Sequence, residues 1–337
     1  MRYAFAFVGL LLTPTAAPAQ TGAGDAGLLL GLSTVSESDS APQVLTTHWI
    51  TWTGGAARAV QTIPGLVVPR ADGFWRAMIT RACMLPENYI PEDIEKVHCV
   101  DSLWTGPATQ PLPPVVTNWM TPCSAEYAEL RFASPSVLSQ WSRLWLSDCA
   151  ARGFSDRYRE WVRTWERDSG LAFAALGAGA GDAYAEAAGR ALNVGAPYDG
   201  PQPQDSTCQA DPRDQTGWRI ERDSAGWRGV LFQQQGNELC LLEGPIAWPL
   251  PDSVVGFRDP PVPWPAVTAA VPDARQAFAA PGGALVLVAG PGGNRLLELT
   301  DSGARQLLAL PDGQVVMVQW ATRGAVARWT GMLAQLN

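Results

Sequence analysis

Histidine is nearly absent from this 337-residue chain, since His48 and His98 are the only two. A serine or cysteine nucleophile usually needs a neighbouring base, most often an imidazole, and imidazole is also the commonest metal ligand. The motifs G-x-S-x-G, H-E-x-x-H and S-x-x-K are missing too, as are a P-loop and any C-x-x-C pair. The sequence therefore predicts no catalytic residue, no metal site and no bound cofactor.

Lysine is scarcer still, because Lys96 stands alone beside 23 scattered arginines, and the formal net charge is −8. Nucleic-acid binding needs a basic surface that displaces condensed counterions. Attraction to anionic lipid also needs a cluster of basic residues. The composition thus argues against nucleic acid and against an anionic membrane surface as partners.

A run of about 20 apolar residues, the length that spans a bilayer, does not occur. The N-terminus instead has Arg2, the short apolar run AFAFVGLLL at 4–12 and the small-residue motif A-P-A at 17–19. This order is typical of a cleavable signal peptide. We expect cleavage after Ala19 and a secreted or periplasmic protein, with no membrane insertion after the signal peptide is removed.

Cysteine occurs in an even number, six, and export would place these cysteines in an oxidising compartment. Six cysteines allow many pairings, and their spacing favours three local bridges. These are Cys83–Cys99, Cys123–Cys149 and Cys208–Cys240. In the chain-entropy description, a disulfide that closes a loop of about 15 residues contributes about 3 kcal/mol of stability. A cysteine metal site is the weaker alternative, because histidine is scarce and no C-x-x-C pair is present.

The segment 43–83 has the pattern of β-hairpins. Short β-branched and aromatic runs are separated by Gly54-Gly55, Pro64-Gly65 and Asp72-Gly73. Turns of this kind between alternating apolar runs are the strongest short-range hairpin signal. We therefore expect antiparallel strands throughout this segment.

Two large aromatic residues, Phe74 and Trp75, directly follow the last of these turns. They are either a binding platform or core. Side chains alternate along a strand, so Trp75 shares its face with Ala77 and Ile79, which makes that face the apolar one. We predict that Trp75 belongs to the core and that Phe74 is the exposed aromatic ring.

Residues 137–165 fit two structures. Val137, Trp141 and Trp145 recur at helical spacing, but they also alternate with Ser139 and Arg143 as they would along a strand. The periodicity slightly favours a helix and leaves the choice open.

The segment 171–193, LAFAALGAGAGDAYAEAAGRALN, predicts a central packing helix. Asp182 is suited to the N-cap, and Tyr184, Ala187 and Ala188 belong to an apolar stripe that follows it. Its glycine-rich loop resembles a nucleotide-binding fingerprint only in part, because Asp182 stands where the third glycine belongs. A carboxylate would repel a pyrophosphate at that position, so we expect no nucleotide.

Glycines recur every ten residues near the C-terminus, at positions 283, 293, 303 and 313. One strand and one tight turn fill ten residues, so the pattern predicts a four-stranded antiparallel meander, which a C-terminal helix follows. A propeller blade has the same form, but the other β segments lack this spacing.

These patterns together predict an α+β protein with mixed antiparallel sheets, a central packing helix and a C-terminal four-stranded meander. The expected organisation is a signal peptide (1–19), a flexible lead-in (20–42), an N-terminal α+β domain (43–198), a polar linker (199–217) and a β-rich C-terminal part that ends in a helix (218–337).

Residues 125–192 also carry a resemblance in layout. The run AELRFASPSVLSQW, a small-residue turn CAARG and the stretch EWVRTWERDSGLAFAALGAGAGDAYAEAAGRAL follow one another. This order is similar to the secreted α+β domain of lysozyme-sensing anti-sigma factors and of the accessory part of some peptidoglycan deacetylases, with WRIERDSAGW extending it towards residue 232. The resemblance implies strands over 137–165. The family's His-bearing glycine turn is CAARG here (149–153), so no ligand role is carried over to it.

Two functional hypotheses follow. The first is a secreted, non-enzymatic envelope or extracellular module that binds a glycan or a protein, since tryptophan is abundant at 15 residues. The alternative is a hydrolase of envelope polysaccharide, which needs only two carboxylates about 5–10 Å apart. The candidate carboxylates are Asp93, Glu95, Glu160 and Glu166. A structural subunit with a protein partner is a third reading.

Overall fold

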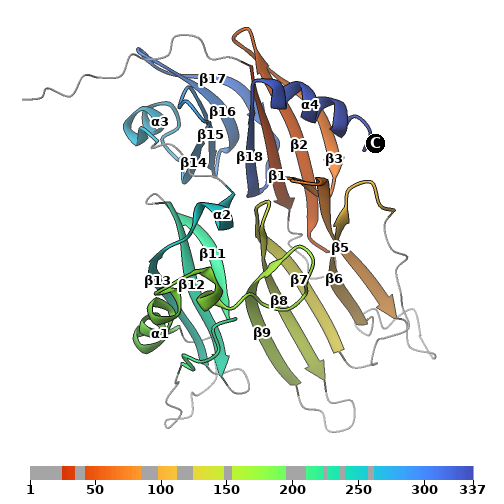
Figure 1. Cartoon of the computed structure of the whole chain (residues 1–337), viewed down its shortest axis with the longest axis vertical. Helices are drawn as coiled ribbons and strands as arrows, with labels where there is room; N and C mark the ends of the chain where they lie inside the picture. Colours follow the sequence, from red (N-terminus) through yellow and green to blue (C-terminus); the bar gives the residue numbers. More distant parts are fainter. Residues whose placement is uncertain are drawn as a thin grey trace, which may run out of the picture.

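The computed structural model describes residues 25–34, 42–84, 98–111, 124–147, 154–194, 210–223, 226–235, 240–256 and 262–336. It is 59% strand and 16% helix, and its strands form four sheets (Figure 1). The predicted α+β class is therefore wrong, because the protein is mostly β. Many strands are buried on both faces, and such strands do not show the polar–apolar alternation that identifies a strand in sequence.

Sheet A joins the two ends of the chain. Its strand order is β18 (Gln314–Thr322), β1 (Ala26–Thr34), β2 (Val44–Thr53), β3 (Ala56–Pro64). Strand β1 is paired on both sides and buried along almost its whole length. The expectation of a flexible lead-in is thus wrong for residues 26–34. The run GLLLGL has no polar side that would mark it as a strand, since both of its faces are covered.

Sheet B has six strands in sequence order. These are β4 (Leu66–Arg70), β5 (Gly73–Met84), β6 (His98–Pro107), β7 (Ser124–Ala133), β8 (Val137–Ser147) and β9 (Phe154–Thr164). Strands β6 and β7 meet only at one parallel pair, Val100 and Glu126, and the other pairs are antiparallel. Because β8 and β9 form a long hairpin, the strand alternative for residues 137–165 is confirmed and the helical one is wrong.

Sheet C has the order β10 (Leu192–Val194), β13 (Cys240–Pro249), β12 (Gly226–Gln235), β11 (Trp218–Asp223). Helix α1 (Ala180–Arg190) packs beside it after a short 3-10 helix, η2 (Phe173–Leu176). Since α1 and β10 join β11–β13, the elements on either side of residues 199–217 share one sheet and one core.

The predicted helix exists but begins earlier than expected. Gly179 is its N-cap and Asp182 lies in its first turn, so the prediction of Asp182 as N-cap is wrong. Tyr184, Ala187 and Ala188 are buried, as the apolar stripe predicted.

Sheet D is an antiparallel meander of β14 (Gln276–Ala279), β15 (Leu285–Gly290), β16 (Gly293–Thr300) and β17 (Gly303–Leu310). The meander is four-stranded as predicted, but its membership differs. The last predicted strand, now β18, leaves sheet D and pairs with β1. Strand β14, which has no glycine at the ten-residue spacing, takes its place in the sheet.

Three further helices connect or cover the sheets. Helix α2 (Asp252–Val255) lies between sheets C and D, and α3 (Trp264–Ala270) packs on sheet D (Figure 1). Helix α4 (Gly324–Leu333) covers sheet A, where Trp49 Nε1 donates to Thr330 Oγ1 at 3.1 Å. No helix in the described part of the chain has the length and apolarity needed to cross a bilayer.

Neighbouring sheets share continuous apolar cores. Trp49, Leu66 and Leu130 belong to the core between sheets A and B, and Trp218 and Val162 to the core between sheets B and C. A third core joins sheets A and D. In Figure 1 sheets D and A form the upper half of the molecule and sheets C and B the lower half, so all four approach one another near the centre.

Phe74 and Trp75 both pack on the core between sheets A and B, as predicted for Trp75 but not for Phe74. Phe74 is only 8% exposed and packs edge-on against Trp329 of α4, with ring centroids 5.8 Å apart. The expectation that Phe74 is the exposed ring is therefore wrong, because a helix about 250 residues later in the chain covers that face. Trp75 is half-buried, its Nε1 donates to Asp72, and the Arg70 guanidinium lies 4.6 Å from its ring centroid.

The cysteine pairing is only partly visible. Strand register places Cys83 opposite Cys99, and Cys99 is disulfide-bonded. Opposed residues on antiparallel strands have the Cα separation that a disulfide requires. The three predicted pairings stay predictions, because Cys123, Cys149 and Cys208 lie outside the described residues, as do the side chains of Cys83 and Cys240.

Sheet A depends on close approach at Gly27. A Cβ atom there would lie 2.0 Å from Cη2 of the fully buried Trp49. We expect Gly27→Ala to lower the free energy of unfolding by about 1–3 kcal/mol, the usual cost of overpacking a core. Urea unfolding measures this. Gly189→Ala, at an open position in α1, is the matched control and should raise stability by up to about 1 kcal/mol. Equal effects of the two changes would contradict the packing of β1.

Candidate functional site

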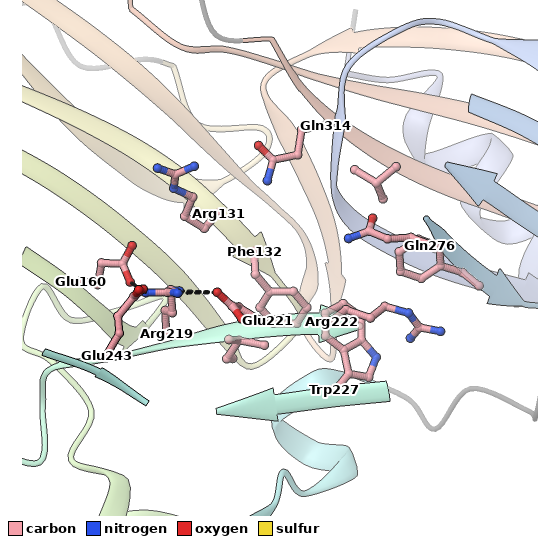
Figure 2. Close-up of a pocket in the computed structure, with 13 residues that line it drawn as sticks. Arg131, Phe132, Glu160, Arg219, Glu221, Arg222, Trp227, Glu243, Gln276 and Gln314 are labelled. Carbon is pink, nitrogen blue, oxygen red and sulfur yellow. Dashed lines mark hydrogen bonds and ion pairs between the residues drawn. The ribbon is translucent and has the colours of Figure 1, made fainter. Parts of the chain in front are cut away.

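A pocket of about 410 Å³ lies where strands from all four sheets meet (Figure 2). Sheet B contributes β7 and β9, sheet C contributes β11, β12 and β13, sheet D contributes β14, and sheet A contributes β18. We call it the junction pocket. Its charged lining residues are Arg131, Glu160, Arg219, Glu221, Arg222 and Glu243. The lining thus includes three cations and three anions and has no net formal charge.

Arg219 of β11 is shared by three carboxylates in this pocket. Its Nη1 donates to Glu160 Oε2 at 2.6 Å and also to Glu243 Oε1, so these two carboxylates are close neighbours. Its Nε and Nη2 contact Glu221 Oε1 at 2.6 and 2.5 Å. Because Glu160 is on β9 and Glu243 on β13, the cluster ties sheet B to sheet C (Figure 2).

The strand pattern explains how Arg219 reaches the pocket. In the β11 sequence WRIERD, Trp218 and Ile220 are buried in the core between sheets B and C. Side chains alternate along a strand, so Arg219 and Glu221 occupy the other face. The alternation can be read from the sequence of β11. No sequence pattern indicates that Glu160, 59 residues earlier, is the ion-pair partner of Arg219.

Burial raises the pKa of the Glu160 carboxyl, which is only 6% exposed, above its ordinary value. Arg219 and Arg131 oppose this rise and Glu243 adds to it. One guanidinium shared by three carboxylates does not offset the desolvation of the most buried of them. Burial also acts to lower the pKa of Arg219, but Glu160 and Glu221 outweigh it, so the net pKa of Arg219 is raised and the side chain stays charged.

Aromatic rings form another wall of the pocket. Trp227 of β12 lies between Phe132 and Phe278, with ring centroids 4.8 and 6.1 Å away. The Arg222 guanidinium stacks 5.0 Å from the Trp227 centroid and 4.4 Å from that of Phe278. The indole Nε1 of Trp227 is buried and has no hydrogen-bond partner among the described residues.

A second hollow of about 890 Å³ adjoins the junction pocket, and Glu160 lines both. It follows the seam between β9 and sheet C, where Trp161 pairs with Gly217 in an isolated antiparallel bridge. Tyr158 and Asp214 also line it. The two hollows therefore meet at the most buried carboxylate of the cluster.

Of the four carboxylates considered from sequence, the structure describes two, and of these two only Glu160 lies in this site. Glu166 is exposed and ion-paired with Arg70, whereas Asp93 and Glu95 lie outside the described residues. Sequence reasoning could not separate Glu160 from surface charges. Sequence reasoning did not identify Glu243, Glu221 or Arg219. For Arg219 and Glu221 the period-two pattern of β11 was the only signal available.

His48 takes no part in the pocket. His48 is a strand residue whose ring nitrogens lie 3.0 and 3.4 Å from the hydroxyls of Thr62 and Thr46, and burial lowers its pKa. The side chain of His98 lies outside the described residues. In the part of the chain that the structure describes, no group of His, Cys, Asp or Glu side chains is arranged to hold a metal ion. No protein-family model and no curated protein matches this chain.

The raised pKa of Glu160 predicts a pH-dependent stability difference. Above the ordinary glutamate pKa of about 4.3, the unfolded chain ionises Glu160 more readily than the folded one does. Stability from this group is therefore present at low pH and is lost as pH rises through the raised pKa. Urea unfolding over a pH series should show the stability of Glu160→Gln rising relative to wild type in that window.

The matched control is Glu186→Gln on α1, where the carboxylate is exposed and pairs with Arg190. The stability of Glu160→Gln should rise relative to that of Glu186→Gln as pH increases through the raised pKa of Glu160. A constant or falling difference between the two variants would contradict the assigned direction.

Proposed function

We propose that this protein is an exported, non-enzymatic binding module whose junction pocket takes a polar ligand of glycan chemistry. The observation that supports this proposal is the pocket's lining, where balanced charges stand beside stacked aromatic rings. A sugar offers an apolar C–H face together with hydroxyl groups that both donate and accept hydrogen bonds. Aromatic rings suit the first, and carboxylates, guanidinium groups and amides suit the second.

Two side-chain amides add further hydrogen-bonding groups to the pocket lining. Gln276 of β14 and Gln314 of β18 lie on the opposite side from the Glu160–Arg219 pair (Figure 2). Each primary amide supplies both a donor and an acceptor, the pair of functions that a sugar hydroxyl also carries. Because the lining has no net formal charge, it suits a neutral polar ligand better than an anion or a cation.

Hydrolysis of envelope polysaccharide is the second candidate. It is favoured by the raised pKa of Glu160 beside Glu243, since a glycosidase needs one protonated and one ionised carboxyl group. The position of Arg219 argues against it. In a hydrolase the scissile bond lies between the two carboxylates, whereas here Nη1 of Arg219 bonds to both of them. Binding without turnover is therefore the better supported function.

Binding can be tested by calorimetry with neutral β-1,4-linked N-acetylhexosamine oligosaccharides, which share the linkage of envelope glycan strands. Gln314→Ala should weaken binding about 2–10-fold, the usual effect of one hydrogen bond. Gln306→Ala, an exposed strand position outside the pocket, is the matched control and should bind as wild type does. No binding by wild type, or equal binding by both variants, would overturn the proposal. Release of new reducing ends by wild type but not by Glu160→Gln would establish the hydrolase instead.

A further inference from the structure

We propose that the open face of β7, β8 and β9 is a track for a linear glycan chain, one end of which occupies the junction pocket. This inference rests on the proposed function and extends it, because it names a polymer rather than a single sugar as the ligand. The track is an arginine–aromatic ladder. It consists of Tyr127, Arg131, Trp141, Arg143 and Tyr158.

Strand register places the ladder on one face of sheet B. Tyr127, Arg143 and Tyr158 are opposed in one row across the three strands. The neighbouring row is Glu129, Trp141 and Glu160. Residues directly opposed in an antiparallel pair point to the same side of the sheet, and so do residues two apart on a strand. Both rows therefore project from the same face.

The rings and cations of the ladder stack on one another. The guanidinium of Arg131 lies 5.4 Å from the Trp141 ring centroid, and that of Arg143 lies 5.7 Å from Tyr158. The rings of Trp141 and Tyr158 are 6.2 Å apart and inclined by 37°. Each cation is within the distance at which it is attracted to an aromatic face. The stacking holds the rings in place before any ligand arrives, which lowers the entropic cost of binding.

Sheet C covers one end of this face and also contacts its β9 edge, where Gln234 Oε1 accepts a hydrogen bond from the Tyr158 backbone amide. Phe132 and Val162 at that end lie in the core with sheet C, and Ser139 Oγ accepts a hydrogen bond from the Ile220 amide at 3.3 Å. Beyond that end the ladder side chains are half-buried, so part of each remains open to solvent. This face of sheet B is apolar under sheet C. Its uncovered part carries stacked aromatic and charged side chains.

The ladder leads into the junction pocket. Arg131 belongs to the ladder and also lines the pocket, and Glu160 lies in the same row as Trp141. Tyr158 lines the adjoining hollow, which meets the pocket at Glu160. A chain that lies along the ladder thus reaches the Arg219 cluster without crossing another element of sheet B.

The chemistry of the ladder favours a glycan over other polymers. Arg131 is paired with Glu129 at 2.9 Å, so the surface offers little of the unpaired positive charge that nucleic acid requires. A protein partner commonly inserts large apolar anchors, but the ladder carries no exposed large hydrophobic side chain. Among the described residues Val44 and Val60 are the exposed ones, and both are in sheet A. Aromatic faces bordered by polar groups suit the repeated C–H faces and hydroxyls of a sugar chain.

The test compares chain lengths by calorimetry, using the N-acetylhexosamine disaccharide and hexasaccharide. Wild type should bind the hexasaccharide more tightly. Trp141→Ala should weaken hexasaccharide binding about 3–10-fold, the scale of one aromatic stacking contact, and leave disaccharide binding unchanged. Arg143→Gln is a milder second variant with an effect in the same direction. Trp264→Ala, at a half-buried tryptophan on α3, is the matched control and should bind both ligands as wild type does.

The outcomes separate the two proposals. Disaccharide binding that is weakened in Gln314→Ala, with no gain for the hexasaccharide and no effect of Trp141→Ala, would overturn the track and keep the pocket. No binding of either ligand would overturn both. Binding of a DNA oligonucleotide that depends on Trp141 would overturn the glycan assignment of the ladder.

Discussion

The central constraint in this structure is that Arg219 must keep its charge in a buried place. A guanidinium that loses contact with water needs carboxylates beside it, and here Glu160, Glu221 and Glu243 arrive from three different strands. Satisfying one cation therefore fixes how β9 of sheet B lies against β11 and β13 of sheet C. Burial raises the pKa of the most buried of them, Glu160, because the single shared cation does not offset its desolvation. The cluster lines a polar pocket that lies between apolar cores.

Pairing of the two chain ends completes the pocket. Strand β18 pairs with β1, and its first residues, Gln314 and Val315, form part of the pocket wall. This pairing places β18 in sheet A rather than in sheet D, where its glycine spacing predicts it. The glycans that we propose as ligands would thus contact a wall that β18 forms while it is paired with β1.

Local signals predicted the turns at Asp72-Gly73, the apolar stripe of α1 and the meander of sheet D. They failed where distant segments cover a strand. Residues 26–34 have no polar side, because β18 and β2 flank them and cores lie on both faces. Phe74 is covered by Trp329 of α4, and no sequence pattern near Phe74 predicts this contact. Of the candidate site, the alternation around Arg219 was readable, but its pairing with Glu160 follows only from how the sheets pack.

We propose above all that a glycan binds at the junction pocket and along the arginine–aromatic ladder. The most direct measurement is a nitrogen–proton NMR spectrum of the tryptophan indole groups during titration with the N-acetylhexosamine hexasaccharide. The account predicts that the indole signals of Trp227 and Trp141 shift, while those of Trp49 and Trp165, which already donate to protein oxygens inside the core, do not. A titration that moves none of the indole signals, or moves only those of Trp49 and Trp165, would contradict it.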